Sequence, residues 1–265
     1  MLNEALDFKA ESDALYALMK DLDDAAFDAP TQFKGWSLNN VLEHLHMWNW
    51  AANESYVDED NFVSWLDGVL KTMAGSGGMR AYEAEWNGGK KGQELLAIWH
   101  GFYTEMAARF VEVDAKKRLK WAGPDMSARS SISARLMETW AHGQEVFDQL
   151  GVVRENTDSI RSIAVLGTNT FGWTYATRGE TPPGPMPFVK LTAPSGDVWE
   201  FGEPSDDERV EGAAADFCQV VTQVRNIADT DLLVTGAVAT DWMSKAQCFA
   251  GAPETPPAPG TRFTK

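Results

Sequence analysis

Hydrophobic residues recur every three or four positions through the first half of the chain, the spacing of helices that bury one face. This repeat predicts four long helices, at about 3–21, 38–52 with a weaker continuation toward 70, 92–113 and 128–150. Ser37 is placed to cap the second helix, and Gly151 to end the fourth. Glycine-rich stretches at 75–78 and 87–89 predict a loop between the second and third helices. Four amphipathic helices joined by loops predict a bundle.

Shorter apolar runs replace the helical stripes beyond residue 160. They predict a short helix at 160–167, a β-hairpin from 188–191 and 198–201, a strand at Val210, a helix at 213–224, a strand at 232–234 and a helix at 241–249. The expected class is therefore α+β, with a metal-binding four-helix bundle at 1–155 and a smaller α+β domain at 156–252. Prolines between 253 and 265 predict a loose tail.

The charge balance narrows the choice of partners. Acidic residues number 39 against 23 basic ones, and a formal charge of −16 repels phosphate backbones and anionic membranes. We therefore expect no nucleic-acid and no membrane partner. No stretch approaches the ~18 uninterrupted apolar residues of a membrane-spanning helix. Acids also stand among the first residues, where a signal peptide would carry a basic flank, so a cytoplasmic protein is expected.

The two cysteines, Cys218 and Cys248, each lie within an apolar run. Neither belongs to a Cys-x-x-Cys pair, which excludes a thiolate zinc finger and argues against a disulfide framework. Both are therefore interpreted as core residues.

The chain has few side chains that could bind a metal through nitrogen, namely the four histidines His44, His46, His100 and His142. Glu138 and His142 lie one helical turn apart, so both can reach a single ion. Imidazole and carboxylate together suit Zn²⁺, with Ni²⁺ or Fe²⁺ as alternatives. Helical spacing alone does not decide which other histidine joins them, and a Glu-x-x-x-His pair by itself is also typical of surface or buried helix pairs.

A family resemblance makes that choice. The segment 35–45, Gly-Trp-Ser-Leu-Asn-Asn-Val-Leu-Glu-His-Leu, resembles the start of the second helix in DinB-like proteins, and most closely the mycothiol-dependent maleylpyruvate isomerase group. In that group the histidine eight residues after the tryptophan is a metal ligand, which implies His44 and not His46. The Glu-x-x-x-His pair of the fourth helix supplies the other ligands, which implies Glu138 and His142. Glu145 stands where the family often has Asp, which leaves the role of that position open.

The resemblance extends over nearly the whole chain, including 194–202 and 246–251, and points to an uncharacterised bacterial branch. It implies a metal-dependent enzyme that activates a low-molecular-weight thiol, such as mycothiol, bacillithiol or glutathione, for isomerisation or transfer on a small electrophilic substrate. We expect one divalent ion, Zn²⁺ first, and we expect Arg225 to bind substrate.

Two other functions stay open at this point. One is a thiol-independent metallohydrolase or lyase that uses the same three ligands. The other is a non-catalytic protein that only holds a metal or a small ligand. A small-molecule substrate is the expected partner under the enzymatic readings, and the sequence leaves a homodimer open.

Overall fold

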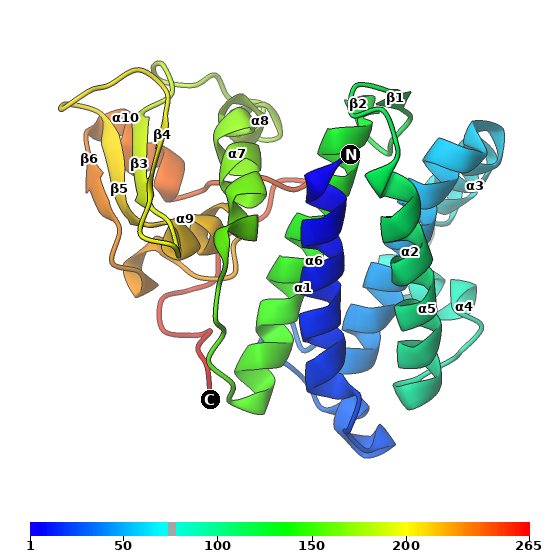
Figure 1. Cartoon of the computed structure of the whole chain (residues 1–265). Coiled ribbons are helices and arrows are strands. Elements are labelled where there is room, and N and C mark those ends of the chain that lie inside the picture. The colour runs from blue at the N-terminus through cyan, green and yellow to red at the C-terminus, as the bar shows by residue number, and fades with distance from the viewer. Residues whose placement is uncertain (74–77) are drawn as a thin grey trace. The chain divides into compact units, whose positions relative to one another are not determined.

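The computed structural model describes residues 1–73 and 78–265, and the chain divides into two compact units, Met1–Gln149 and Leu150–Lys265. The first unit is helical and the second combines helices with a mixed sheet (Figure 1), which confirms the predicted α+β class. The division falls six residues before the predicted boundary at 155. That the two units are separate domains stays a prediction.

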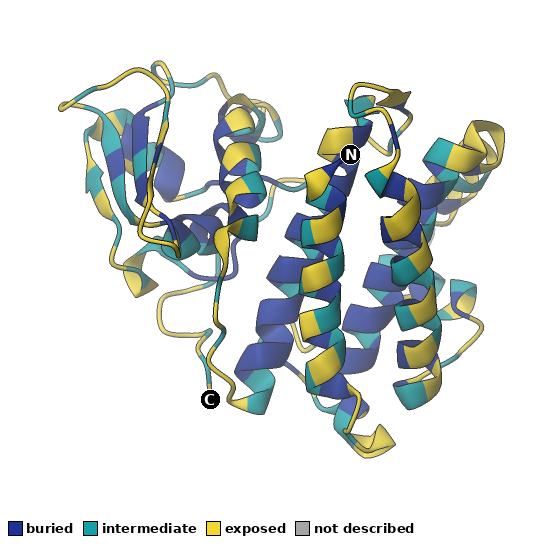
Figure 2. Cartoon of the chain, viewed as in Figure 1, coloured by how far each residue is buried: buried dark blue, intermediate teal, exposed yellow. Residues whose placement is uncertain are grey.

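Four long helices form the body of the first unit, as predicted. They and the elements between them are α1 (Asn3–Met19), α2 (Leu38–Val57), α3 (Glu59–Met73), α4 (Gly78–Trp86), α5 (Gly92–Val111), the short strands β1 (Arg118–Leu119) and β2 (Met126–Ser127), and α6 (Ala128–Leu150). Helix α1 packs on α5, and α2 packs on α5, α3 and α4. The buried positions of α1 and α5 lie along one side of each helix and the exposed positions along the other (Figure 2), as their apolar stripes require.

The predicted ends of α2 and α6 have the expected local chemistry. Ser37 and Asn40 form a capping box, in which each side chain accepts from the other residue's backbone N–H. At the other end of the unit, α6 stops at Leu150 and Gly151 adopts φ 68°, the left-handed conformation that ends a helix with little strain in glycine.

Two details between the second and third predicted helices are wrong. The second helix does not run on toward 70, because Asp58 leaves helical geometry at φ −150°, ψ 83° and its carboxylate accepts from the N–H of Asn61 to start α3. Residues 79–86, expected to be loop, form most of α4. Asn87 and the two glycines after it end α4, as the sequence indicated. Residues 75–77 of the predicted loop lie outside the described part of the chain.

The second unit is built around a four-stranded sheet. Its elements are α7 (Arg161–Asn169), α8 (Phe171–Ala176), β3 (Phe188–Thr192), β4 (Val198–Phe201), β5 (Arg209–Ala213), α9 (Ala214–Val221), β6 (Leu233–Thr235) and α10 (Ala237–Met243). The strand order is β4-β3-β5-β6, with β3 and β5 parallel and the other pairs antiparallel. The predicted hairpin is confirmed as the β3–β4 pair, in which Leu191 lies opposite Trp199.

The last predicted helix is displaced. It was expected at 241–249, and α10 occupies Ala237–Met243 instead. The carboxylate of Glu208 accepts from the N–H groups of Val238 and Ala239, which satisfies the first turn of an earlier helix. Beyond that helix, the N–H of Cys248 bonds to the carbonyl of Val221. Hydrogen bonds to other elements therefore use backbone groups that the local pattern had assigned to a helix.

The tail at 253–265 has no helix or strand, but it is not loose. Asn226 donates to the carbonyl of Pro257, the N–H of Gly260 donates to Asp229, and Arg262 donates to the carbonyl of Gln223. These bonds fasten the tail to the second unit.

Both cysteines are buried, as predicted, and neither forms a disulfide; burial raises the pKa of the Cys218 thiol. Within the described part of the chain, no helix has both the length and the apolar character needed to cross a membrane.

Candidate metal centre

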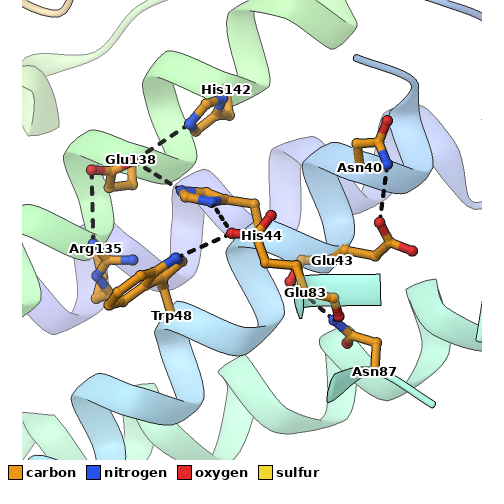
Figure 3. Close-up of polar contacts among 9 residues, drawn as sticks. All are labelled: Asn40, Glu43, His44, Trp48, Glu83, Asn87, Arg135, Glu138 and His142. Atoms are coloured by element: carbon orange, nitrogen blue, oxygen red, sulfur yellow. Dashed lines mark hydrogen bonds and ion pairs between the residues drawn. The ribbon is translucent and has the colours of Figure 1, made fainter. Parts of the chain in front are cut away.

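The three side chains proposed as ligands come together in the first unit (Figure 3), His44 from α2 and Glu138 and His142 from α6. Oε2 of Glu138 lies 3.5 Å from Nε2 of His44 and 3.4 Å from Nε2 of His142. One ligand atom from each residue lies within 4.8 Å of the others. The side chains are only slightly exposed, between 12% and 18%.

This arrangement fits a divalent ion. Two imidazole nitrogens and one carboxylate oxygen form a ligand set used by catalytic zinc sites. Metal–ligand bonds of about 2.0–2.1 Å in a tetrahedron place neighbouring ligand atoms about 3.3 Å apart. The Glu138–histidine separations of 3.4 and 3.5 Å are close to that edge, and the ligand atoms of the two histidines lie within 4.8 Å of each other.

Two further carboxylates lie behind the two histidines. Nδ1 of His44 is 2.7 Å from Oε1 of Glu83, and Nδ1 of His142 is 3.5 Å from Oε1 of Glu145. A carboxylate that accepts a hydrogen bond from Nδ1–H keeps that proton on Nδ1, leaves Nε2 free to bind metal and fixes the ring orientation. Glu145, whose role the sequence left open, therefore occupies the position behind His142.

Glu83 was missed because its helix was expected to be loop. Its backbone carbonyl accepts from the side chain of Asn87, which also donates to the carbonyl of Glu43 and so fastens α4 to α2. Trp48 donates its indole N–H to the same Glu83 oxygen that faces His44. The carboxylate of Glu43 takes a bond from Asn40 instead (Figure 3). A buried glutamate on a short helix between glycine-rich stretches gives no local signal of this role.

The tryptophan of the resembling segment covers the ligands. The Trp36 ring lies parallel to the His142 ring, with centroids 5.2 Å apart and an interplanar angle of 2°, and its centroid is 5.4 Å from that of His44. A tight turn positions the Trp36 ring, since the backbone N–H of Trp36 donates to the carbonyl of Phe33. Lys34 and Gly35 at the turn centre have φ 51° and 69°, as the type I′ turn requires.

The carboxylates set the charge of the site in the absence of metal. Burial lowers the pKa of His142, but the charges and hydrogen bonds of Glu145 and Glu138 outweigh it and raise that pKa to about 10. The pKa of His44 is also raised, because Glu83 and Glu138 outweigh burial. Burial raises the pKa of Glu138, yet the histidines and Arg135 hold it well below its usual value. At neutral pH the His142 ring therefore carries a proton that a bound metal ion would displace.

The remaining predicted residues lie elsewhere. His46 points between the edges of Trp86 and Phe102, and burial lowers its pKa to about 4. His100 stacks on Tyr16 with centroids 4.2 Å apart.

Arg225 follows α9 in the second unit, is 8% exposed and donates to the carbonyl of Val224. It is not a surface arginine, and its role in substrate binding stays a prediction.

Comparison with known proteins identifies the family. Residues 8–147 match the family model described as the mycothiol maleylpyruvate isomerase N-terminal domain. Uncharacterised proteins from two strains of Mycobacterium tuberculosis, CDC 1551 and H37Rv, are each 37% identical over 247 residues, which cover 93% of this chain and 95% of theirs.

The fold has solved counterparts. A crystal structure of the mycothiol-dependent maleylpyruvate isomerase superposes with a TM-score of 0.52 at 15% identity, over 82% of this chain and 87% of that one. A histidine variant of the same enzyme gives the same TM-score at 14% identity. At these identities the likeness shows the fold alone. From the match over residues 8–147 and the relatives at 37% identity, the chain belongs to the mycothiol maleylpyruvate isomerase N-terminal domain family.

Proposed function

We propose that this protein is a zinc-dependent enzyme that activates a low-molecular-weight thiol for isomerisation or transfer on a small electrophilic substrate. The observation that carries the proposal is the set of three ligands, His44, Glu138 and His142, with a carboxylate behind each histidine. A zinc ion held by three protein side chains keeps a fourth position for an exogenous ligand and stabilises a thiol there as its thiolate.

The chain's own side chains support an exogenous nucleophile. Both cysteines are buried in the second unit, at 0% and 4% exposure, so neither offers a thiolate to a substrate. Glu83 lies 2.7 Å from Nδ1 of His44 and Glu145 lies 3.5 Å from Nδ1 of His142, and the Trp36 ring lies parallel to the His142 ring. The solved neighbour is named as a mycothiol-dependent enzyme, which places a thiol among the ligands to test.

The test uses the full chain loaded with Co²⁺, because a cobalt–thiolate bond adds an intense near-ultraviolet absorption band. We expect this band with mycothiol, bacillithiol or glutathione, and we expect a proton to be released as the thiol binds. S-methylglutathione is the matched control ligand, because it keeps the peptide and lacks the thiol. The His142→Ala variant is the control protein.

One result would contradict the thiol mechanism. If cobalt protein that binds azide gives no new band with any of the three thiols, the ion has an open position that does not accept them. The proposal would then fail in favour of a thiol-independent hydrolase or lyase. If neither azide nor a thiol changes the spectrum, the site is closed, and a non-catalytic binding protein is the better description.

A further inference from the structure

Arg135 lies one turn before Glu138 on α6 and faces the carboxylate oxygen that the histidines leave free (Figure 3). Its Nη2 is 3.9 Å from Oε1 of Glu138, while Oε2 of the same carboxylate faces both histidines. The two oxygens of Glu138 are thereby divided between the proposed metal position and a cation.

The surroundings of Arg135 do not explain its burial. The side chain is 4% exposed, and its Nε and Nη1 have no hydrogen-bond partner. Its guanidinium lies 5.4 Å from the centre of the Trp121 ring. Among the described residues, Glu138 is the only acidic group that forms an ion pair with it. Arginine stays charged at all ordinary pH values, and a buried cation without an anionic neighbour is costly. The burial of Arg135 is therefore explained by its ion pair with Glu138 and not by local packing.

The charges around the site lead to the same conclusion. Glu83, Glu138 and Glu145 bring three carboxylates to two histidines that must be neutral at Nε2 to bind a metal. A divalent ion balances two of these negative charges, and Arg135 balances the third. Without the guanidinium, the freed Oε1 of Glu138 would carry uncompensated charge beside the ion and could turn toward it as a second ligand atom.

We propose that Arg135 is a positioning residue that holds Glu138 as a one-oxygen ligand and balances the third carboxylate of the site. This inference rests on the metal site of the proposed function. It does not depend on a thiol.

The test compares zinc affinity, measured by competition with a chromogenic chelator, in four full-length proteins. They are the wild type, Arg135→Met, Arg135→Lys and, as the matched control, Arg129→Gln, which removes a 61% exposed arginine of the same helix. Arg135→Met keeps bulk against Trp121 and removes the charge. Its zinc affinity should fall about 10- to 100-fold because Glu138 loses the partner that orients it, and this loss outweighs the attraction that the extra negative charge adds. Arg135→Lys keeps the charge and should recover most of the loss, while Arg129→Gln should equal the wild type.

The cobalt spectrum reports the coordination number of the ion, which a mere loss of protein stability would not change. A Glu138 that becomes a two-oxygen ligand raises the coordination number, so the visible d–d bands of Arg135→Met should weaken relative to the wild type at full cobalt loading. Wild-type affinity and spectrum in Arg135→Met would overturn the inference. Equal losses in the Met and Lys variants would also overturn it, because charge would then not be the cause. If Arg135→Met does not fold, the Lys variant decides: its affinity should stay within about tenfold of the wild type, and a larger loss overturns the inference.

These outcomes separate the inference from the proposed function. A wild-type protein that binds zinc but no thiol contradicts the thiol mechanism and leaves the role of Arg135 intact. A thiol-responsive wild type with an unaffected Arg135→Met variant contradicts the role of Arg135 alone.

Discussion

Oε1 of Glu83 on α4 lies 2.7 Å from Nδ1 of His44 on α2, although 39 positions separate the two residues. In a neutral His44 this contact favours the proton on Nδ1, which leaves Nε2 free toward Glu138. Glu83→Gln keeps the shape and removes the charge, so it should weaken zinc binding about 10- to 100-fold. Chelator competition measures this loss, and Glu85→Gln, an exposed change on the same helix, is the control. Equal affinities in the two variants would show that Glu83 does not support the ligand.

The ligand set itself is tested by metal content. His142→Ala removes one of three ligands and should abolish the expected one ion per chain, measured by elemental analysis after gel filtration. His46→Gln and His100→Gln should retain it, because those rings pack against aromatic side chains away from the site. Loss of metal in either of these variants would contradict the assignment of ligands.

Metal affinity should depend steeply on pH. Because the pKa of His142 is raised to about 10, binding at pH 7 must displace a proton from that ring, and the raised pKa of His44 acts in the same direction. The apparent affinity should rise about tenfold per pH unit for each displaced proton. Titration calorimetry in two buffers of different ionisation enthalpy counts the protons, and the absence of proton release would contradict this charge state.

The metal-free protein should respond to pH in the opposite sense. A folded-state pKa raised above the unfolded value stabilises the fold fully below about pH 6.5, and this contribution is lost as the pH rises through about 10. Urea unfolding of the metal-free protein between pH 7 and 10 should therefore show falling stability. The His142→Ala variant should lose much of this pH dependence. If its free energy of unfolding falls with pH as steeply as in the wild type, other groups cause the dependence.

Limited proteolysis tests the two units. Val153 is 80% exposed and lies just after the division at Gln149/Leu150, so thermolysin should cut first near 151–154. Mass spectrometry should find fragments that end there. First cuts at 179–187, the proline-rich segment before β3, would instead place the most accessible backbone inside the second unit.

Much of the first unit was predictable because its signals are local. A helix that buries one face repeats its apolar residues with the period of the backbone, so α1, α5 and α6 were found within two residues at either end. The Glu138–His142 pair was visible for the same reason, since one turn of a known helix sets their separation. The capping box at Ser37 and the end of α6 at Gly151 also depend on residues close in sequence.

The rest depended on contacts between distant segments. Helical periodicity placed His44 and His46 equally well, and only the packing of α2 turns His44 toward α6 and His46 toward Trp86 and Phe102. Glu83 and the true position of α10 were likewise set by bonds that cross from one element to another. Sequence by itself determined the four long helices of the first unit and the spacing of two proposed ligands along α6, and its family resemblance named His44 as the third. Tertiary structure decided how His44 reaches Glu138 and which carboxylates lie behind the histidines, because that choice depends on the faces that neighbouring helices bury.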